Sequence, residues 1–151
     1  MSAIIIALLV IATASSGSIF KPGEWYRSLR KPSWTPPGWA FPVVWSILYI
    51  AIGVSGWLVW QAQGMGIAMG LWLLQLVFNG AWSWLFFGRR RMDLAFGNIC
   101  LMFLTIIAYM ITAWPVSQTA VLLFLPYAAW VATAGTLNRA VWRLNPDATP
   151  R

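Results

Sequence analysis

Five apolar stretches without a charged side chain constrain the fold of this chain more than any other feature. They cover residues 3–20, 40–60, 66–87, 94–113 and 118–137. A helix of about 20 residues, rising about 1.5 Å per residue, crosses the roughly 30 Å hydrocarbon core of a bilayer. The pattern therefore predicts an all-α integral membrane protein, a bundle of five transmembrane helices that forms one domain over residues 1–151.

The composition excludes the main soluble alternatives. Charged residues make up 9% of the chain and hydrophobic residues 60%, whereas about 25% of an average globular protein is charged. This is too little charge for a water-soluble enzyme and too much apolar surface for a disordered chain. The net charge of +7 does not indicate a nucleic-acid partner, because no polar stretch could form a basic face on a soluble domain.

Missing residue types remove several kinds of chemistry. The chain has no histidine and one cysteine, Cys100, which excludes an intrachain disulfide, imidazole-ligated haem, His-based zinc sites and Ser-His-Asp catalysis. The five stretches contain no Asp, Glu, Lys or Arg, which argues against a proton-coupled pump, an ion channel and acid–base catalysis inside the bundle. We expect no metal site, no cofactor and no assigned catalytic residue.

The first stretch has a competing interpretation. Ala12, Thr13 and Ala14 resemble a signal-peptidase site, which would make residues 3–20 a cleaved leader. However, no basic side chain precedes the apolar run, and the run continues through Ile19 and Phe20. We therefore expect a retained helix.

The basic residues predict the orientation of the bundle. With five spans, every Lys and Arg falls on one side, and the connections at residues 61–65 and 114–117 contain none. The positive-inside rule places the amino terminus outside and the carboxyl terminus in the cytoplasm, and we expect a bacterial cell membrane. The basic residues are Lys21, Arg27, Arg30, Lys31, Arg89, Arg90, Arg91, Arg139, Arg143 and Arg151.

The connection at residues 21–39 is long and rich in proline and tryptophan. Its residues 31–39 read Lys-Pro-Ser-Trp-Thr-Pro-Pro-Gly-Trp. A loop of this length is usually functional or disordered, and proline restricts the backbone while tryptophan seeks an interface or a packed surface. We expect an ordered cap over a pocket in the bundle. The alternative is an interfacial lid that contacts no ligand.

Several tryptophans lie inside the stretches rather than at their ends. Counted from the basic side at about 1.5 Å per residue, three of them lie roughly 7 to 10 Å deep. The layer comprises Trp45, Trp82, Trp130, Asn79, Asn98, Leu101 and Ala134. Aromatic walls with a few amide groups suit a flat, apolar ligand, but the same residues can equally well pack helices together. Periodicity does not decide between a pocket and packing.

Four segments carry a specific pattern. They read Lys-Pro-Ser-Trp-Thr-Pro-Pro at 31–37, Phe-Pro-Val-Val-Trp-Ser-Ile-Leu-Tyr at 41–49, Gln-Leu-Val-Phe-Asn-Gly-Ala-Trp-Ser at 75–83 with Phe-Phe-Gly at 86–88, and Leu-Pro-Tyr-Ala-Ala-Trp at 125–130 continuing to Leu-Asn at 137–138. Over nearly the whole chain the sequence resembles the TspO/MBR family. That family comprises the tryptophan-rich sensory proteins of bacteria and the translocator protein of mitochondria, or peripheral benzodiazepine receptor.

The resemblance implies a five-helix bundle with a pocket open toward the first loop. The implied ligands are porphyrins such as protoporphyrin IX, together with cholesterol and synthetic isoquinoline or benzodiazepine compounds. It also implies a homodimer, for which Gly66 and Gly70 on the third span form a GxxxG pair. The implied ligand-binding residues are Trp45, Asn79, Trp82, Trp130, Ala134, Leu137, Gly97 and Leu101, with Trp34, Pro36 and Pro37 in the loop.

Two positions depart from the family pattern. The vertebrate cholesterol motif has a tyrosine where this chain has Arg139, which weakens the case for cholesterol binding by this route. Asn98 stands where many relatives carry aspartate, so a charge near the implied pocket is absent.

The resulting hypothesis is a membrane protein that binds tetrapyrroles and acts as a sensor, regulator or translocator in tetrapyrrole and stress responses. A porphyrin would stack on the tryptophans, hydrogen-bond to Asn79 and be covered by the loop. One alternative is a light- and oxygen-dependent enzyme that degrades porphyrin, with Trp45 and Trp130 as candidate catalytic residues. Another is a sterol or lipid translocator, and the sequence does not decide among these roles.

Overall fold

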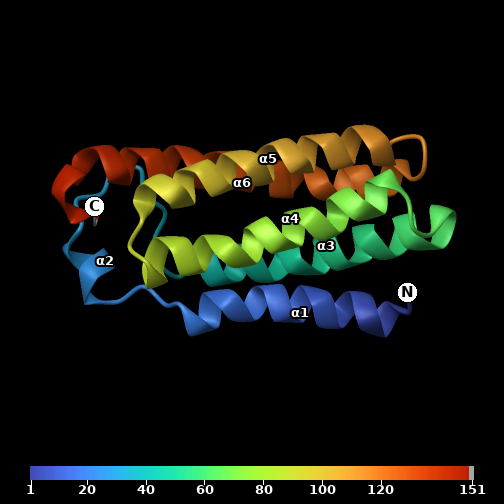
Figure 1. Cartoon of the computed structure of the whole chain (residues 1–151), viewed down its shortest axis with the longest axis horizontal. Helices are drawn as coiled ribbons and strands as arrows, with labels where there is room; N and C mark the ends of the chain where they lie inside the picture. The colour runs from blue at the N-terminus through green and yellow to red at the C-terminus, as the bar shows by residue number, and fades with distance from the viewer. Residues whose placement is uncertain (150–151) are drawn as a thin grey trace.

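The regular structure is helical throughout residues 1–149, the part of the chain that a computed structural model describes (Figure 1). This confirms the all-α prediction. The elements are α1 (Ala3–Ile19), α2 (Glu24–Ser28), α3 (Ala40–Gln63), α4 (Ile67–Ser83), the π-helical turn η1 (Trp84–Gly88), α5 (Met92–Ala113), α6 (Gln118–Leu144) and the 3₁₀ turn η2 (Pro146–Ala148).

Four helices are long and apolar enough to cross a membrane: α3, α4 with its continuation η1, α5 and α6. The fifth, α1, is apolar but has 17 residues, or about 25 Å at the rise of an α-helix. The protein is thus a multi-pass membrane helical bundle with one shorter helix. The two short elements α2 and η2 were not predicted from the sequence.

The boundary of the last span is the main difference between prediction and structure. The prediction ended this span at residue 137, whereas α6 continues to Leu144. Arg139 and Arg143 lower the hydropathy of this segment, but a helix that has left the hydrocarbon core carries exposed arginines without penalty. Hydropathy therefore located the end of the uncharged stretch and not the end of the helix.

Local sequence explains where several helices begin and end. Ser2 caps α1 by accepting a hydrogen bond from the backbone N–H of Ile5 at 3.3 Å, and Ser117 caps α6 by accepting from Ala120 at 3.2 Å. These bonds satisfy amide groups that a helix leaves unpaired at its first turn. Gly64 ends α3 with φ of 71°, a backbone conformation that glycine adopts without steric cost.

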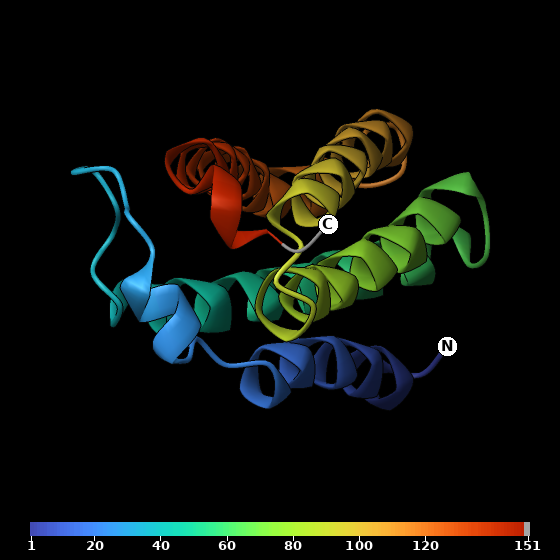
Figure 2. The same cartoon turned by 60° about the vertical axis from the view of Figure 1, so that its left-hand side comes forward.

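The helices form three layers, seen in both Figure 1 and Figure 2. α3 and α4 lie between α1 on one side and the pair α5 and α6 on the other, with contacts between α4 and α5, α5 and α6, and α3 and α6. Gly56 of α3 lies directly against the fully buried indole of Trp72 on α4.

The connections that carry the basic residues lie together at one end of the bundle. In Figure 1 the segment with α2, the turn between η1 and α5, and the last turns of α6 are all at the left. The amino terminus and the connections at 64–66 and 114–117 are at the right. We call the left-hand end the basic end. Arg151, which the sequence also assigned to it, lies outside the described residues.

Candidate functional site

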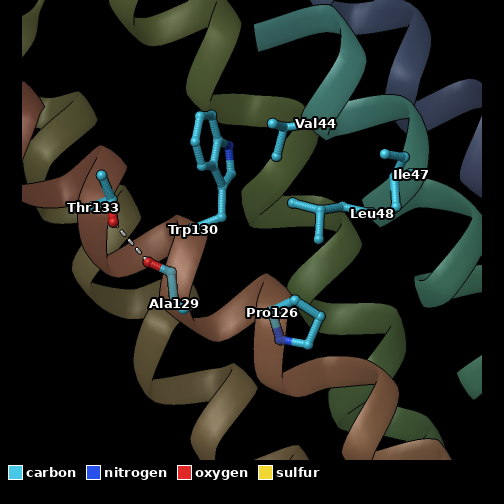
Figure 3. A pocket seen from close by; sticks show the side chains of 7 residues that line it. All are labelled: Val44, Ile47, Leu48, Pro126, Ala129, Trp130 and Thr133. Carbon is cyan, nitrogen blue, oxygen red and sulfur yellow. Dashed lines mark hydrogen bonds between the residues drawn. The ribbon is translucent and has the colours of Figure 1, made fainter. Parts of the chain in front are cut away.

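A groove of about 340 Å³ runs between α3 and α6 (Figure 3). Almost all of its surface is apolar, and its outer rim is exposed on the side of the bundle that faces lipid. Its lining residues are Val44, Ile47 and Leu48 from α3 and Pro126, Ala129, Trp130 and Thr133 from α6. The groove is therefore an apolar surface that opens on the side of the bundle.

Trp130 provides the aromatic wall of this groove and an unused hydrogen-bond donor. Its indole stands between α6 and α3, with the nitrogen on the side of Val44 (Figure 3), and its ring packs edge-on against Phe41 at 5.7 Å. Within residues 1–149, Nε1 of Trp130 is buried and has no hydrogen-bond partner. A buried N–H without an acceptor is costly, so a ligand acceptor placed here would relieve that cost.

Two other tryptophans show how buried indoles are normally satisfied in this bundle. Nε1 of Trp72 donates to the carbonyl oxygen of Ile52 at 2.9 Å, and Nε1 of Trp82 donates to Oδ1 of Asn138 at 3.1 Å. The unpaired donor of Trp130 is thus a departure from the pattern in the rest of the core.

A polar network lies in the core of the bundle. Tyr49 donates to Oδ1 of Asn79 at 2.8 Å, and Nδ2 of Asn79 donates to the hydroxyl of Tyr127 at 2.8 Å. Tyr127 donates to Oε1 of Gln75 at 2.8 Å, and Nε2 of Gln75 donates to the carbonyl oxygen of Trp72. Asn79 therefore joins α3 to α6 through α4, and both ends of its amide are already paired with protein groups.

Trp45 lies beside this network. Its ring stacks on Tyr49 with centroids 5.3 Å apart and meets Tyr127 edge-on at 6.1 Å. The half-buried indole of Trp45 extends the aromatic surface of α3 from Tyr49 toward α6. The structure thus brings Trp45 and Asn79 together through shared partners, Tyr49 and Tyr127.

Trp82 lies toward the basic end, where it packs against both the main core and a second cluster. It stacks on Phe86 with centroids 5.0 Å apart, and its partner Asn138 donates through Nδ2 to the carbonyl oxygen of Met92 at 2.9 Å. Leu137 is buried in this second cluster. These residues hold the ends of α4, α5 and α6 together.

The remaining residues implied by the resemblance are dispersed. Ala134 is half-buried against the main core, whereas Gly97 and Leu101 lie on the exposed face of α5. Neither of these two lines the groove between α3 and α6. Asn98 donates to the carbonyl oxygen of Phe78 at 2.8 Å, which ties α5 to α4.

The proline-rich loop extends from the bundle beside the last turns of α6, as the light-blue segment in Figure 2 shows. Trp34 is 51% exposed, Pro36 is half-buried and Pro37 is exposed. The start of the loop is held by Asn145, whose Oδ1 accepts from the backbone N–H of Arg30 at 2.9 Å and whose Nδ2 donates to the Arg30 carbonyl oxygen at 2.9 Å. These two hydrogen bonds anchor the start of the loop to the end of α6.

Aromatic rings and cations meet where α2 packs on η1. Tyr26 lies edge-on to Phe87 at 5.4 Å, and Nζ of Lys31 lies 4.5 Å from the ring centre of Tyr26. Burial raises the pKa of Tyr26 above its ordinary value, so its phenol stays neutral at physiological pH. Asp93 pairs with Arg91 at 2.6 Å at the start of α5.

Sequence reasoning missed most of the groove. It singled out Trp130 but not the lining residues one turn away on the same helix, Pro126 and Thr133, nor Val44 and Leu48 on α3. The available signal was helical spacing: residues three and four positions from Trp130 share its face. The tyrosines of the network were also missed, because pairing across 48 residues leaves no trace in local periodicity.

Comparison with known proteins gives a consistent result. The model of the TspO/MBR family matches residues 3–143. The chain is 40% identical to "Protein CrtK" of Rhodobacter capsulatus, over 99% of this chain and 98% of that protein. It is 39% identical to "Tryptophan-rich sensory protein" of Cereibacter sphaeroides (89% and 85% covered) and 41% identical to "Translocator protein" of Homo sapiens (85% and 81% covered).

Proposed function

Because the chain belongs to the TspO/MBR family, with a match over residues 3–143, we propose that it binds a porphyrin-type tetrapyrrole beside Trp130. One edge of the flat ligand enters the groove between α3 and α6. The observation that carries this proposal is the buried, unpaired N–H of Trp130 in an otherwise apolar groove. An apolar site with one well-placed polar group orients a hydrophobic ligand.

Residues in the groove and next to it have separate roles in this proposal. Trp130 and Phe41 offer aromatic surface for stacking, worth about 0.5–1.5 kcal/mol beyond area burial for an aromatic pair. The N–H of Trp130 donates to a carboxylate, carbonyl or ring-nitrogen acceptor of the ligand. Asn79 lies in the polar network of the core. Its side-chain amide can hydrogen-bond to a ligand only when the bond to Tyr49 or Tyr127 breaks.

In this proposal the bound tetrapyrrole is sensed, regulates a response or is transported, and no chemical reaction is assigned to the protein. The loop at residues 31–39 is tied to α6 through Asn145 and Arg30, and α6 carries Trp130. If a ligand displaces α6, this displacement is therefore transmitted to the loop through Asn145 and Arg30. In this proposal the loop closes over the ligand and its position is the signal.

The arrangement in the membrane is part of the proposal. All five apolar helices cross the bilayer, with the basic end in the cytoplasm of a bacterial cell and the amino terminus outside. A homodimer forms through α4. This is supported by the exposed Gly70, one turn after Gly66, where an added Cβ would meet no atom within 4 Å. Small residues at such a position allow close approach of a second helix.

The test is a titration of the purified, detergent-solubilised protein with protoporphyrin IX in the dark, followed by tryptophan fluorescence. Saturable quenching is expected in the wild type, together with a sharp loss of affinity in Trp130→Ala. The matched control is Trp114→Ala, which removes an exposed indole at the opposite end of the bundle. This control keeps wild-type affinity.

Two outcomes would contradict the proposal. If quenching does not saturate, or if Trp130→Ala binds as tightly as the wild type while remaining helical by circular dichroism, the groove is not a porphyrin site. Repeating the titration under light separates binding from catalysis. A new absorbing product that requires Trp45 or Trp130 would replace the sensing role by porphyrin degradation, whereas a reversible spectral change agrees with sensing.

A further inference from the structure

A second groove, of about 350 Å³, lies between α5 and α6. It is lined by apolar and small side chains, and part of its rim is exposed to the surroundings of the bundle. The lining residues are Phe96, Ile99, Cys100, Phe103 and Leu104 from α5 and Val131, Ala132, Gly135 and Thr136 from α6. In a bilayer such a groove is filled by an apolar chain.

Two arginines continue the α6 wall of this groove. Ala132, Thr136, Arg139 and Arg143 are spaced by four, three and four residues, and all four are exposed. Residues at these spacings lie on one face of a helix. The face that lines the groove therefore runs directly into Arg139 and Arg143 toward the basic end.

The arginines lie at the depth of lipid headgroups. Arg139 follows the first residue of α6, Gln118, by 21 positions, or about 32 Å at the rise of an α-helix, while the hydrocarbon core measures about 30 Å. Trp142 lies beside the same end of the groove, its ring 6.2 Å from that of Phe96. A tryptophan at this depth is typical of the membrane interface.

Neither arginine has a protein counter-charge in the described part of the chain. The ion pairs within residues 1–149 join Arg27 to Glu24 at 3.5 Å and Arg91 to Asp93 at 2.6 Å. The side chains of Arg139 and Arg143 make no hydrogen bond or ion pair within these residues. Two guanidinium groups, with N–H donors that are unpaired within the described residues, therefore lie at the level of the headgroups, at the end of the apolar groove.

We propose that this surface is a binding site for an anionic phospholipid. One acyl chain lies in the groove between α5 and α6, and the phosphate lies between Arg139 and Arg143. Guanidinium groups pair with phosphate through two parallel hydrogen bonds, and basic residues at the headgroup level attract anionic lipids. The site is separate from the groove of Trp130, which lies on the other side of α6.

Charge argues against the two other occupants of such a groove. A sterol carries one hydroxyl group and no charge, so it leaves both guanidinium groups without an anion. A second copy of this chain in a two-fold symmetric contact would bring its own Arg139 and Arg143 against the same pair, and like charges repel. An anionic phospholipid satisfies both the apolar wall and the arginines.

The experiment counts lipids bound to the purified full-length protein by native mass spectrometry. The protein in mild detergent is titrated with dioleoyl phosphatidylglycerol or dioleoyl phosphatidylcholine. We expect the first phosphatidylglycerol to bind about 25-fold more tightly than phosphatidylcholine, because each cation near an anionic headgroup contributes about fivefold. The double variant Arg139→Gln/Arg143→Gln should reduce this preference to near unity.

Two further variants separate a built site from general charge attraction. Lys21→Gln/Arg89→Gln removes the same charge from the ends of α1 and η1, at positions that do not line the groove, and should keep the preference. Ala132→Phe fills the groove from an exposed position and should weaken phosphatidylglycerol binding with both arginines present. Circular dichroism checks that each variant is folded.

Several results would overturn the proposal. The preference could fall equally in both double variants, or Ala132→Phe could bind phosphatidylglycerol normally. Cholesterol could displace the phosphatidylglycerol. The only cysteine, Cys100, lines the groove, so efficient cross-linking of two chains through it by a short bismaleimide would show that a second copy covers this face.

Discussion

Gly56 is the position where the structure makes its sharpest prediction about stability. An alanine Cβ built there would overlap Cε2 of Trp72 and lie 2.6 Å from both Cζ2 and Nε1. Trp72 is fully buried and its N–H donates to the carbonyl oxygen of Ile52 at 2.9 Å. The indole therefore cannot yield without losing packing and a hydrogen bond.

The expected cost of Gly56→Ala follows from these two losses. Overpacking a tight core costs about 1–3 kcal/mol, and the lost hydrogen bond adds about 0.6–1 kcal/mol in a membrane protein. Their sum, about 2–4 kcal/mol, should appear as a lower free energy of unfolding in detergent micelles, measured by circular dichroism during denaturation with SDS.

Gly97→Ala, at an exposed position on α5 outside both grooves, is the matched control. No atom lies within 4 Å of the added Cβ, and alanine favours a helix interior over glycine by up to about 1 kcal/mol. This variant should be as stable as the wild type or more so. Overpacking would cost much more than about 0.5 kcal/mol. If the free energy of unfolding of Gly56→Ala lies within about 0.5 kcal/mol of the wild-type value, the tight contact between Gly56 and Trp72 is refuted.

Three other substitutions test separate parts of the structure. Asn79→Ala leaves the hydroxyls of Tyr49 and Tyr127 without their amide partner, so it should lower the free energy of unfolding by about 1–3 kcal/mol; unchanged denaturation by SDS would contradict the network. Asn145→Ala removes both hydrogen bonds to Arg30, so trypsin should cleave after Arg30 several times faster, and an unaltered cleavage rate would show that Asn145 does not hold the loop. Leu101→Ala shortens a side chain on the exposed face of α5, so protoporphyrin IX should bind with wild-type affinity; a clear loss would place Leu101 in the site.

The helices and their common basic end were predictable because they depend on local properties. Stretches of about 20 uncharged residues leave few alternatives to a membrane helix, and the alternation of basic and neutral connections fixes which ends lie together. The same reasoning failed at the end of α6, where Arg139 and Arg143 lower the hydropathy although they belong to the helix. It also missed α2, which has five residues and no periodic signal.

Residue counting grouped the candidate site residues by depth, but it could not predict the direction of their side chains. Counting residues placed Trp45, Trp82 and Trp130 in one layer, yet a side chain's direction depends on how each helix is rotated against its neighbours. Trp82 turns toward Phe86 and Asn138, whereas Trp130 turns toward Phe41. Pairing of Asn79 with Tyr49 and Tyr127 across three helices likewise required the tertiary structure.

NMR can test directly whether the N–H of Trp130 donates a hydrogen bond to the bound ligand. Protein labelled with ¹⁵N at the tryptophan indoles gives one NMR signal per indole N–H, and Trp130→Phe identifies the signal of Trp130. Saturating protoporphyrin IX in the dark should move this signal downfield, as expected for a new hydrogen bond, and leave that of Trp72, which is already bonded to Ile52, in place. A Trp130 signal that stays unchanged while the ligand is bound would contradict the account.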